Sequence, residues 1–96
     1  MLILITYDVE TSSDGGQKRL RRVAKICENY GQRVQNSVFE CILDSAQLAI
    51  VKDKLLKEID MAADSLRFYR LGKNWEGKVD HVGAKPSYNP EDVLII

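Results

Sequence analysis

The hydrophobic positions of this chain follow two spacings, one typical of strands and one typical of helices. Residues 1–7 are apolar or β-branched at nearly every position, which predicts a strand in the middle of a sheet. Asp8 ends this strand, and a polar turn segment covers residues 10–16. Across residues 17–30 apolar side chains recur at helical spacing, and Gly31 stands where a left-handed C-cap would end the helix.

The middle of the chain predicts a hairpin and a second helix. Residues 33–43 are rich in β-formers, and residues 36–37 are a plausible turn, so this stretch can form two short strands. Asp44 is a candidate N-cap with Gln47 as its capping-box partner, and the helix is expected to run to about Met61. Its core-facing positions are expected to be Leu48, Val51, Leu55 and Ile59.

The last third of the chain predicts one more strand at residues 66–71 and a short one at 78–82, separated by a loop that carries Trp75. The full order is strand, helix, strand, strand, helix, strand and an extra strand. This order indicates an α+β fold of the ferredoxin-like βαββαβ type. Two helices on one face of the sheet leave its other face uncovered, which favours a homodimer. Residues 84–96, with their apolar end at 93–96, are interpreted as a C-terminal extension that contacts a dimer mate or another partner.

Composition limits the function classes further. With 96 residues, 45% of them hydrophobic and 29% charged, the chain is expected to be one globular domain spanning residues 1–96. The longest apolar run, residues 1–5, is far shorter than the ~20 residues that cross a bilayer, so we expect a cytoplasmic protein without membrane contact. Cys27 and Cys41 do not have the spacing of a zinc site and are expected to be buried thiols.

The net charge is zero, yet positive charge is concentrated in one segment. Residues 17–33 hold six basic side chains against Glu28 alone, a net charge of +5. Charged residues opposite a core stripe are often only solvated, but the strong bias of sign favours binding of phosphate groups. The cations expected on the outer face of the first helix are Lys18, Arg21, Arg22 and Lys25.

Asp8 has two possible roles, and the residue pattern leaves both open. An aspartate after a strand commonly starts a turn through its side chain. Alternatively, Asp8 binds a metal ion together with a second carboxylate. The nearby carboxylates of the same chain, Glu10 and Asp14, both lie in the polar loop. A two-fold dimer would supply a symmetric second Asp8, and two facing carboxylates suit Mg²⁺.

Three segments together resemble a known family: the strand end at residues 5–9, the arginine-rich helix that ends in Asn-Tyr-Gly at 29–31, and Arg-Val-Gln-Asn-Ser-Val-Phe-Glu at 33–40. On these segments the chain is similar to Cas2, the small CRISPR-associated nuclease that is the second core protein of adaptation. The segments at 71–72, 81–83 and 85–86 resemble the branch found beside type I CRISPR systems.

The resemblance implies a ferredoxin-like homodimer in which Asp8 pairs with Asp8 of the other subunit to hold Mg²⁺, with Mn²⁺ as a substitute. It implies an endonuclease that cuts double-stranded DNA or single-stranded RNA. It equally implies a non-catalytic DNA-binding scaffold that bridges dimers of the Cas1 integrase during spacer acquisition. Resemblance and charge together give these expected nucleic-acid-binding residues: Tyr7, Lys18, Arg19, Arg21, Arg22, Lys25, Arg33, Ser37 and Phe39.

Overall fold

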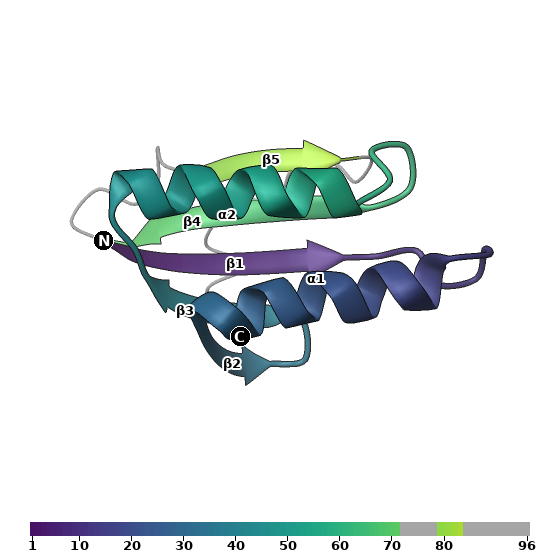
Figure 1. Cartoon of the computed structure of the whole chain (residues 1–96), viewed down its shortest axis with the longest axis horizontal. Coiled ribbons are helices and arrows are strands. Elements are labelled where there is room, and N and C mark those ends of the chain that lie inside the picture. The colour runs from purple at the N-terminus through teal and green to yellow at the C-terminus, as the bar shows by residue number, and fades with distance from the viewer. Residues whose placement is uncertain (72–78, 84–96) are drawn as a thin grey trace.

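The computed structural model describes residues 1–71 and 79–83. Its elements follow the predicted order (Figure 1). The loop with Trp75 and the tail at 84–96 lie outside the described residues, so the expectations for them stay predictions. The elements are β1 (Leu2–Asp8), α1 (Gly16–Tyr30), β2 (Gly31–Gln35), β3 (Val38–Ile42), α2 (Ser45–Glu58), β4 (Ser65–Leu71) and β5 (Val79–Gly83).

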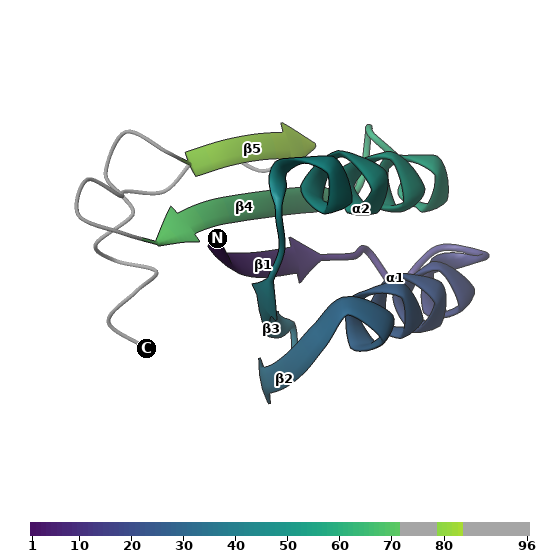
Figure 2. The ribbon, with the colours of Figure 1, turned by 60° about the vertical axis from the view of Figure 1, so that its left-hand side comes forward.

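The five strands form one sheet in the order β2-β3-β1-β4-β5, with every neighbouring pair antiparallel. Both helices cover the same face of this sheet, as Figures 1 and 2 show. This arrangement confirms the predicted ferredoxin-like α+β fold with an extra strand. Among the described residues, no helix is long and apolar enough to cross a membrane.

The core lies between the helices and the sheet. Side chains alternate along a strand, so Ile3, Ile5 and Tyr7 of β1 share the face that the helices cover. They pack with buried residues of both helices and of the flanking strands. The remaining members of this buried core are Val9, Val23, Cys27, Phe39, Cys41, Leu43, Leu48, Val51, Leu55, Ile59, Leu66 and Phe68.

The two cysteines confirm the expectation of buried thiols, since both are free and buried. Burial raises the pKa of the Cys27 thiol to about 12, and the neighbouring Cys41 adds to the effect. Burial raises the pKa of Cys41 as well. Neither thiol is therefore a ready thiolate nucleophile near neutral pH.

The boundaries of both helices differ slightly from the prediction. Asp44 caps α2 in the predicted capping box with Gln47, but the helix ends at Glu58, before the expected Met61. Gly31 ends α1 in an extended conformation, with φ −162°, so the predicted left-handed C-cap is wrong. A Cβ at Gly31 would collide with the Cys41 sulfur and with the Glu40 carbonyl oxygen. Position 31 therefore needs a glycine, because β3 packs closely against its backbone.

Candidate metal site and nucleic-acid interface

Asp8 is the last residue of β1 and is exposed. By strand alternation its side chain lies on the sheet face away from the helices, where it is in register with Ser65 of β4. The Ser65 hydroxyl is buried and makes no hydrogen bond in the described part of the chain. Glu10 follows in the loop, where its carboxylate accepts hydrogen bonds from the backbone and side chain of Ser12.

The described residues of one chain do not make a complete metal site. Residues 1–71 and 79–83 contain no group of three His, Cys, Asp or Glu side chains that could hold an ion. Asp8 and the Ser65 hydroxyl offer hard oxygen ligands of the kind that Mg²⁺ prefers. These two oxygen groups fit part of a magnesium coordination sphere, and its remaining ligands must come from outside the described residues of one chain.

Asp64 was not identified from the sequence and is fully buried, with 0% of its surface exposed. Its carboxylate accepts hydrogen bonds from the Arg19 guanidinium at 2.9 Å and 3.4 Å. The backbone N–H groups of Glu10 and Asp60 donate to it at 2.9 Å and 2.8 Å. Arg19 also donates to the Glu10 carbonyl oxygen at 3.2 Å. We call these four residues the Asp64 cluster.

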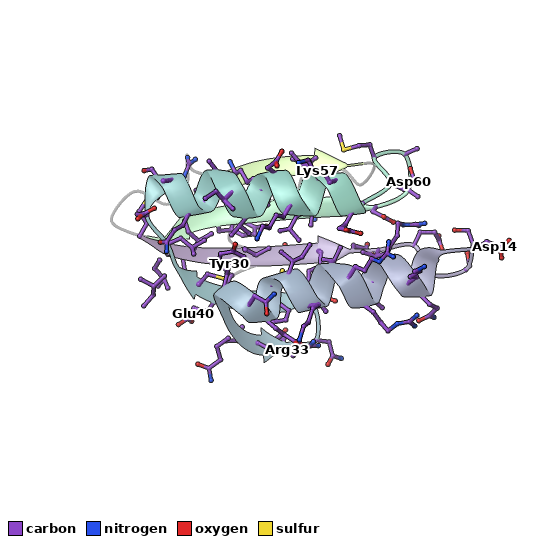
Figure 3. The ribbon with its side chains drawn as sticks, in the orientation of Figure 1. Asp14, Tyr30, Arg33, Glu40, Lys57 and Asp60 are labelled. Carbon is purple, nitrogen blue, oxygen red and sulfur yellow. The ribbon has the colours of Figure 1, made fainter. Side chains whose placement is uncertain are left out.

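The cluster joins two loops at one end of the molecule. Figure 3 shows Asp14 and Asp60 at that same end, in the loops that follow β1 and α2. Burial alone would raise the pKa of Asp64, but hydrogen bonds from Arg19 and from two backbone N–H groups outweigh it and hold that pKa below its usual value. The Asp64 carboxylate is therefore charged, and its hydrogen-bonding capacity is satisfied inside the protein. Arg19 was expected to bind nucleic acid, but its guanidinium makes this internal contact with Asp64.

The outer face of α1 carries the other cations. Lys18, Arg21 and Lys25 are exposed and make no ion pair with any residue that the structure describes. Arg22 lies 3.7 Å from the Glu58 carboxylate, and its side chain is 55% exposed. The four cations thus share one helix face, as their spacing predicted, and three of them make no ion pair with a described residue. Binding of an anionic partner there stays a prediction.

Four further predicted residues meet at the β2–β3 hairpin. The Arg33 guanidinium lies 5.0 Å above the Phe39 ring and donates to the Asn36 carbonyl oxygen at 2.9 Å. The Tyr7 ring stacks beside Phe39, with centroids 6.1 Å apart, and the Tyr7 N–H donates to the Ser37 carbonyl oxygen at 3.1 Å. Figure 3 shows Arg33 at the strand β2 edge of the molecule.

The hairpin group is mostly internal. Phe39 is 0% exposed and Tyr7 6% exposed, so neither ring offers a free face to a base. Burial raises the pKa of Tyr7, with a smaller contribution from Cys27, while the nearby Arg33 lowers it. Arg33 is exposed and pairs with Glu28 at 3.0 Å. The group therefore holds the hairpin against the Asp8 end of β1. Arg33 is the most exposed of the four residues and so the most accessible to a nucleic acid.

Comparison with known proteins gives the same family over most of the chain. The family model described as "CRISPR associated protein Cas2" matches residues 1–79. A protein of Halalkalibacterium halodurans named "CRISPR-associated endonuclease Cas2" is 67% identical over 95 residues, which cover 99% of this chain and 99% of that protein. One of Nitratidesulfovibrio vulgaris named "CRISPR-associated endoribonuclease Cas2" is 62% identical, covering 100% of this chain and 94% of that protein.

Two solved structures share the fold. The crystal structure of Streptococcus pyogenes Cas2 at pH 6.5 aligns with a TM-score of 0.70 and 55% identity. The alignment covers 83% of this chain and 96% of that chain. A hypothetical protein from Thermus thermophilus aligns with a TM-score of 0.67 and 32% identity, covering 75% and 82% of the two chains.

Proposed function

Since this chain belongs to the CRISPR-associated Cas2 family, we propose that it is a cytoplasmic endonuclease of CRISPR adaptation. The substrate is a phosphodiester bond in double-stranded DNA or single-stranded RNA, and the names of its relatives include both endonuclease and endoribonuclease. The observation that carries the proposal is the exposed Asp8 carboxylate at the end of β1, beside an oxygen of Ser65 that has no partner among the described residues.

The proposed active form is a homodimer in which Asp8 and the partner's Asp8 hold Mg²⁺, or Mn²⁺ in its place. A bound ion of this kind polarises the scissile phosphate and lowers the pKa of a bound water. The chain itself supplies the carboxylate and, on the outer face of α1, cations that attract the phosphate backbone. With so few protein ligands the site is expected to turn over slowly.

The test compares wild type with Asp8→Asn, which keeps the shape of the side chain and removes its charge. Both proteins are incubated with duplex DNA and single-stranded RNA, with and without Mg²⁺, after sedimentation has established the dimer. We expect cleavage that requires Mg²⁺ and that falls by at least about 10²-fold in the variant, because the ion loses its charged ligand. If both proteins cleave equally well, the activity comes from a contaminant, and the nuclease proposal is wrong.

The exposed cations of α1 favour a second function of another class. We propose that the same dimer binds duplex DNA through its phosphates and bridges dimers of the Cas1 integrase in spacer acquisition, without catalysis. In that role Asp8→Asn retains DNA binding and spacer acquisition, since no bond is cut by Asp8. Loss of acquisition by this variant, at unchanged DNA affinity, would exclude the purely non-catalytic role.

A further inference from the structure

The Asp64 cluster is the strongest buried polar feature of the described chain. Its carboxylate is wholly buried and accepts from Asp60, four residues before it, and from Glu10 and Arg19 near the start of the chain. Glu10 is held at both of its backbone polar groups, the N–H by Asp64 and the carbonyl oxygen by Arg19. Hydrogen bonds to an ionised group are stronger and more directional than neutral ones, so the cluster fixes the loop backbone at Glu10.

The Asp64 cluster lies next to the end of β1 that carries Asp8. Glu10 lies two residues after Asp8, and Asp64 directly precedes Ser65, which is in register with Asp8. The cluster thus holds the chain on both strands at the point where the β1–β4 ladder ends. Close backbone approaches support it, since a Cβ at Gly16 would collide with the Glu10 carbonyl oxygen and one at Gly83 with that of Asp64.

We propose that Asp64, through Arg19 and Glu10, is a positioning residue that sets the place of the Asp8 carboxylate. β1 ends at Asp8, and the bonds at Glu10 fix the backbone just beyond this end. Without them the end of the strand would fray and Asp8 would sample several positions. Misplacement of a reacting group by about 1 Å can cost on the order of 10²-fold in rate. The inference rests on the proposed role of Asp8 in cleavage.

The test uses Asp64→Asn, which keeps the size of the side chain but removes its charge. The matched control is Asp53→Asn, because Asp53 also pairs with a cation at 2.9 Å, namely Lys57, but on the exposed side of α2. Figure 3 shows Lys57 on that helix. We expect Asp64→Asn to lower kcat about 10- to 100-fold per folded dimer, with KM for the nucleic acid unchanged, and Asp53→Asn to match wild type.

Two readouts separate positioning from general destabilisation. The double variant Asp8→Asn/Asp64→Asn should cleave no more slowly than Asp8→Asn alone, since both changes act through one carboxylate. Amide hydrogen exchange of the protein without metal should show reduced protection at Glu10 in Asp64→Asn and wild-type protection in Asp53→Asn. Arg19→Lys, which keeps the charge but not the forked donor, should give an intermediate kcat and carries the test if Asp64→Asn does not fold.

The outcomes are distinguishable from failure of the proposed function. If Asp8→Asn cleaves like wild type, the nuclease proposal falls, and exchange at Glu10 alone then decides whether the cluster fixes this loop. Wild-type kcat in folded Asp64→Asn, or unchanged protection at Glu10, would overturn the positioning role. A loss of activity that merely follows the unfolded fraction of Asp64→Asn would overturn it as well.

Discussion

The two sides of helix α1 use positive charge in opposite ways. On the inner side Arg19, whose side chain is 18% exposed, donates to the buried Asp64 carboxylate and to the loop after β1. On the outer side Lys18, Arg21 and Lys25 are exposed and have no ion-pair partner among the described residues. Lys18 and Arg19 are therefore adjacent in sequence, yet one is exposed to solvent and the other is bound to a buried carboxylate.

The difference shows that a basic segment cannot be assigned to one function from its charge alone. A charged side chain that is buried away from water must be paired with an opposite charge or with hydrogen-bonding groups. Its main effect is then to fix the positions of those partners. An exposed cation without a partner adds to the field that an incoming phosphate experiences. We therefore expect changes on the inner side to affect stability and changes on the outer side to affect nucleic-acid binding.

The largest effect should come from the inner side. Asp64→Ala removes a buried carboxylate and leaves three donors, including the Arg19 guanidinium, without their acceptor. We expect the free energy of unfolding to fall by about 3 kcal/mol, as for other broken buried ion pairs. Urea unfolding of wild type and variant, monitored by circular dichroism, measures this difference.

The pH dependence of that destabilisation provides its control. The pKa of Asp64 in the folded chain lies below its value in the unfolded chain, which is about 3.9. Its ionisation therefore stabilises the fold fully at pH values well above 4, and this contribution disappears as the pH falls through the folded pKa. The difference between wild type and Asp64→Ala should shrink in acid; a constant difference from pH 7 to pH 3 would show that charge is not its cause.

The second effect lies on the outer side. Replacing Lys18, Arg21 and Lys25 together by Gln should leave the melting temperature unchanged and weaken binding to duplex DNA. The slope of log K against log salt should become shallower by about 0.9 for each DNA phosphate that the variant no longer neutralises. Fluorescence anisotropy with a labelled duplex across a salt series measures affinity and slope together.

A triple change on α2 is the matched control, since it alters the net charge equally. Lys52 lies 5.3 Å from the Phe68 ring centroid, Lys54 donates to the Tyr30 hydroxyl and Lys57 pairs with Asp53. We expect Lys52, Lys54 and Lys57 replaced by Gln to leave the salt slope close to that of wild type. Equal decreases in affinity from both triple variants would mean that binding follows net charge and not the outer face of α1.

The fold was largely predictable because each element carries its own periodicity. The strand before Asp8, the turn at residues 36–37 and the capping box of Asp44 are local patterns, and the structure has all three. Gly31 was misjudged, because its need for a glycine comes from β3 packing against it and not from its own dihedral angles.

The candidate site was predictable only in part. The sequence indicates Asp8 and the cations of α1 as candidates, because strand ends and charge bias are visible along the chain. The Asp64 cluster was missed, since Asp64 and Arg19 are 45 residues apart and meet only when the sheet places β4 beside β1. The burial of Phe39 likewise depends on the helix face that covers it.

Arg22 lies between the two classes and gives the smallest effect. It is 3.7 Å from Glu58, and both side chains are partly exposed at 55% and 30%, so the pair is a surface ion pair. We expect Arg22→Gln to change the free energy of unfolding by no more than about 1 kcal/mol and to lower the salt slope of DNA binding by about 0.9.

Urea unfolding and the anisotropy series, applied to this one variant, therefore place Arg22 on one side or the other. A clear drop in stability with an unchanged salt slope would assign it to the inner set, together with Arg19. Since the long Arg22–Glu58 contact gains little from Coulomb attraction in water, a bound phosphate should compete with Glu58 for the guanidinium, which favours the outer set.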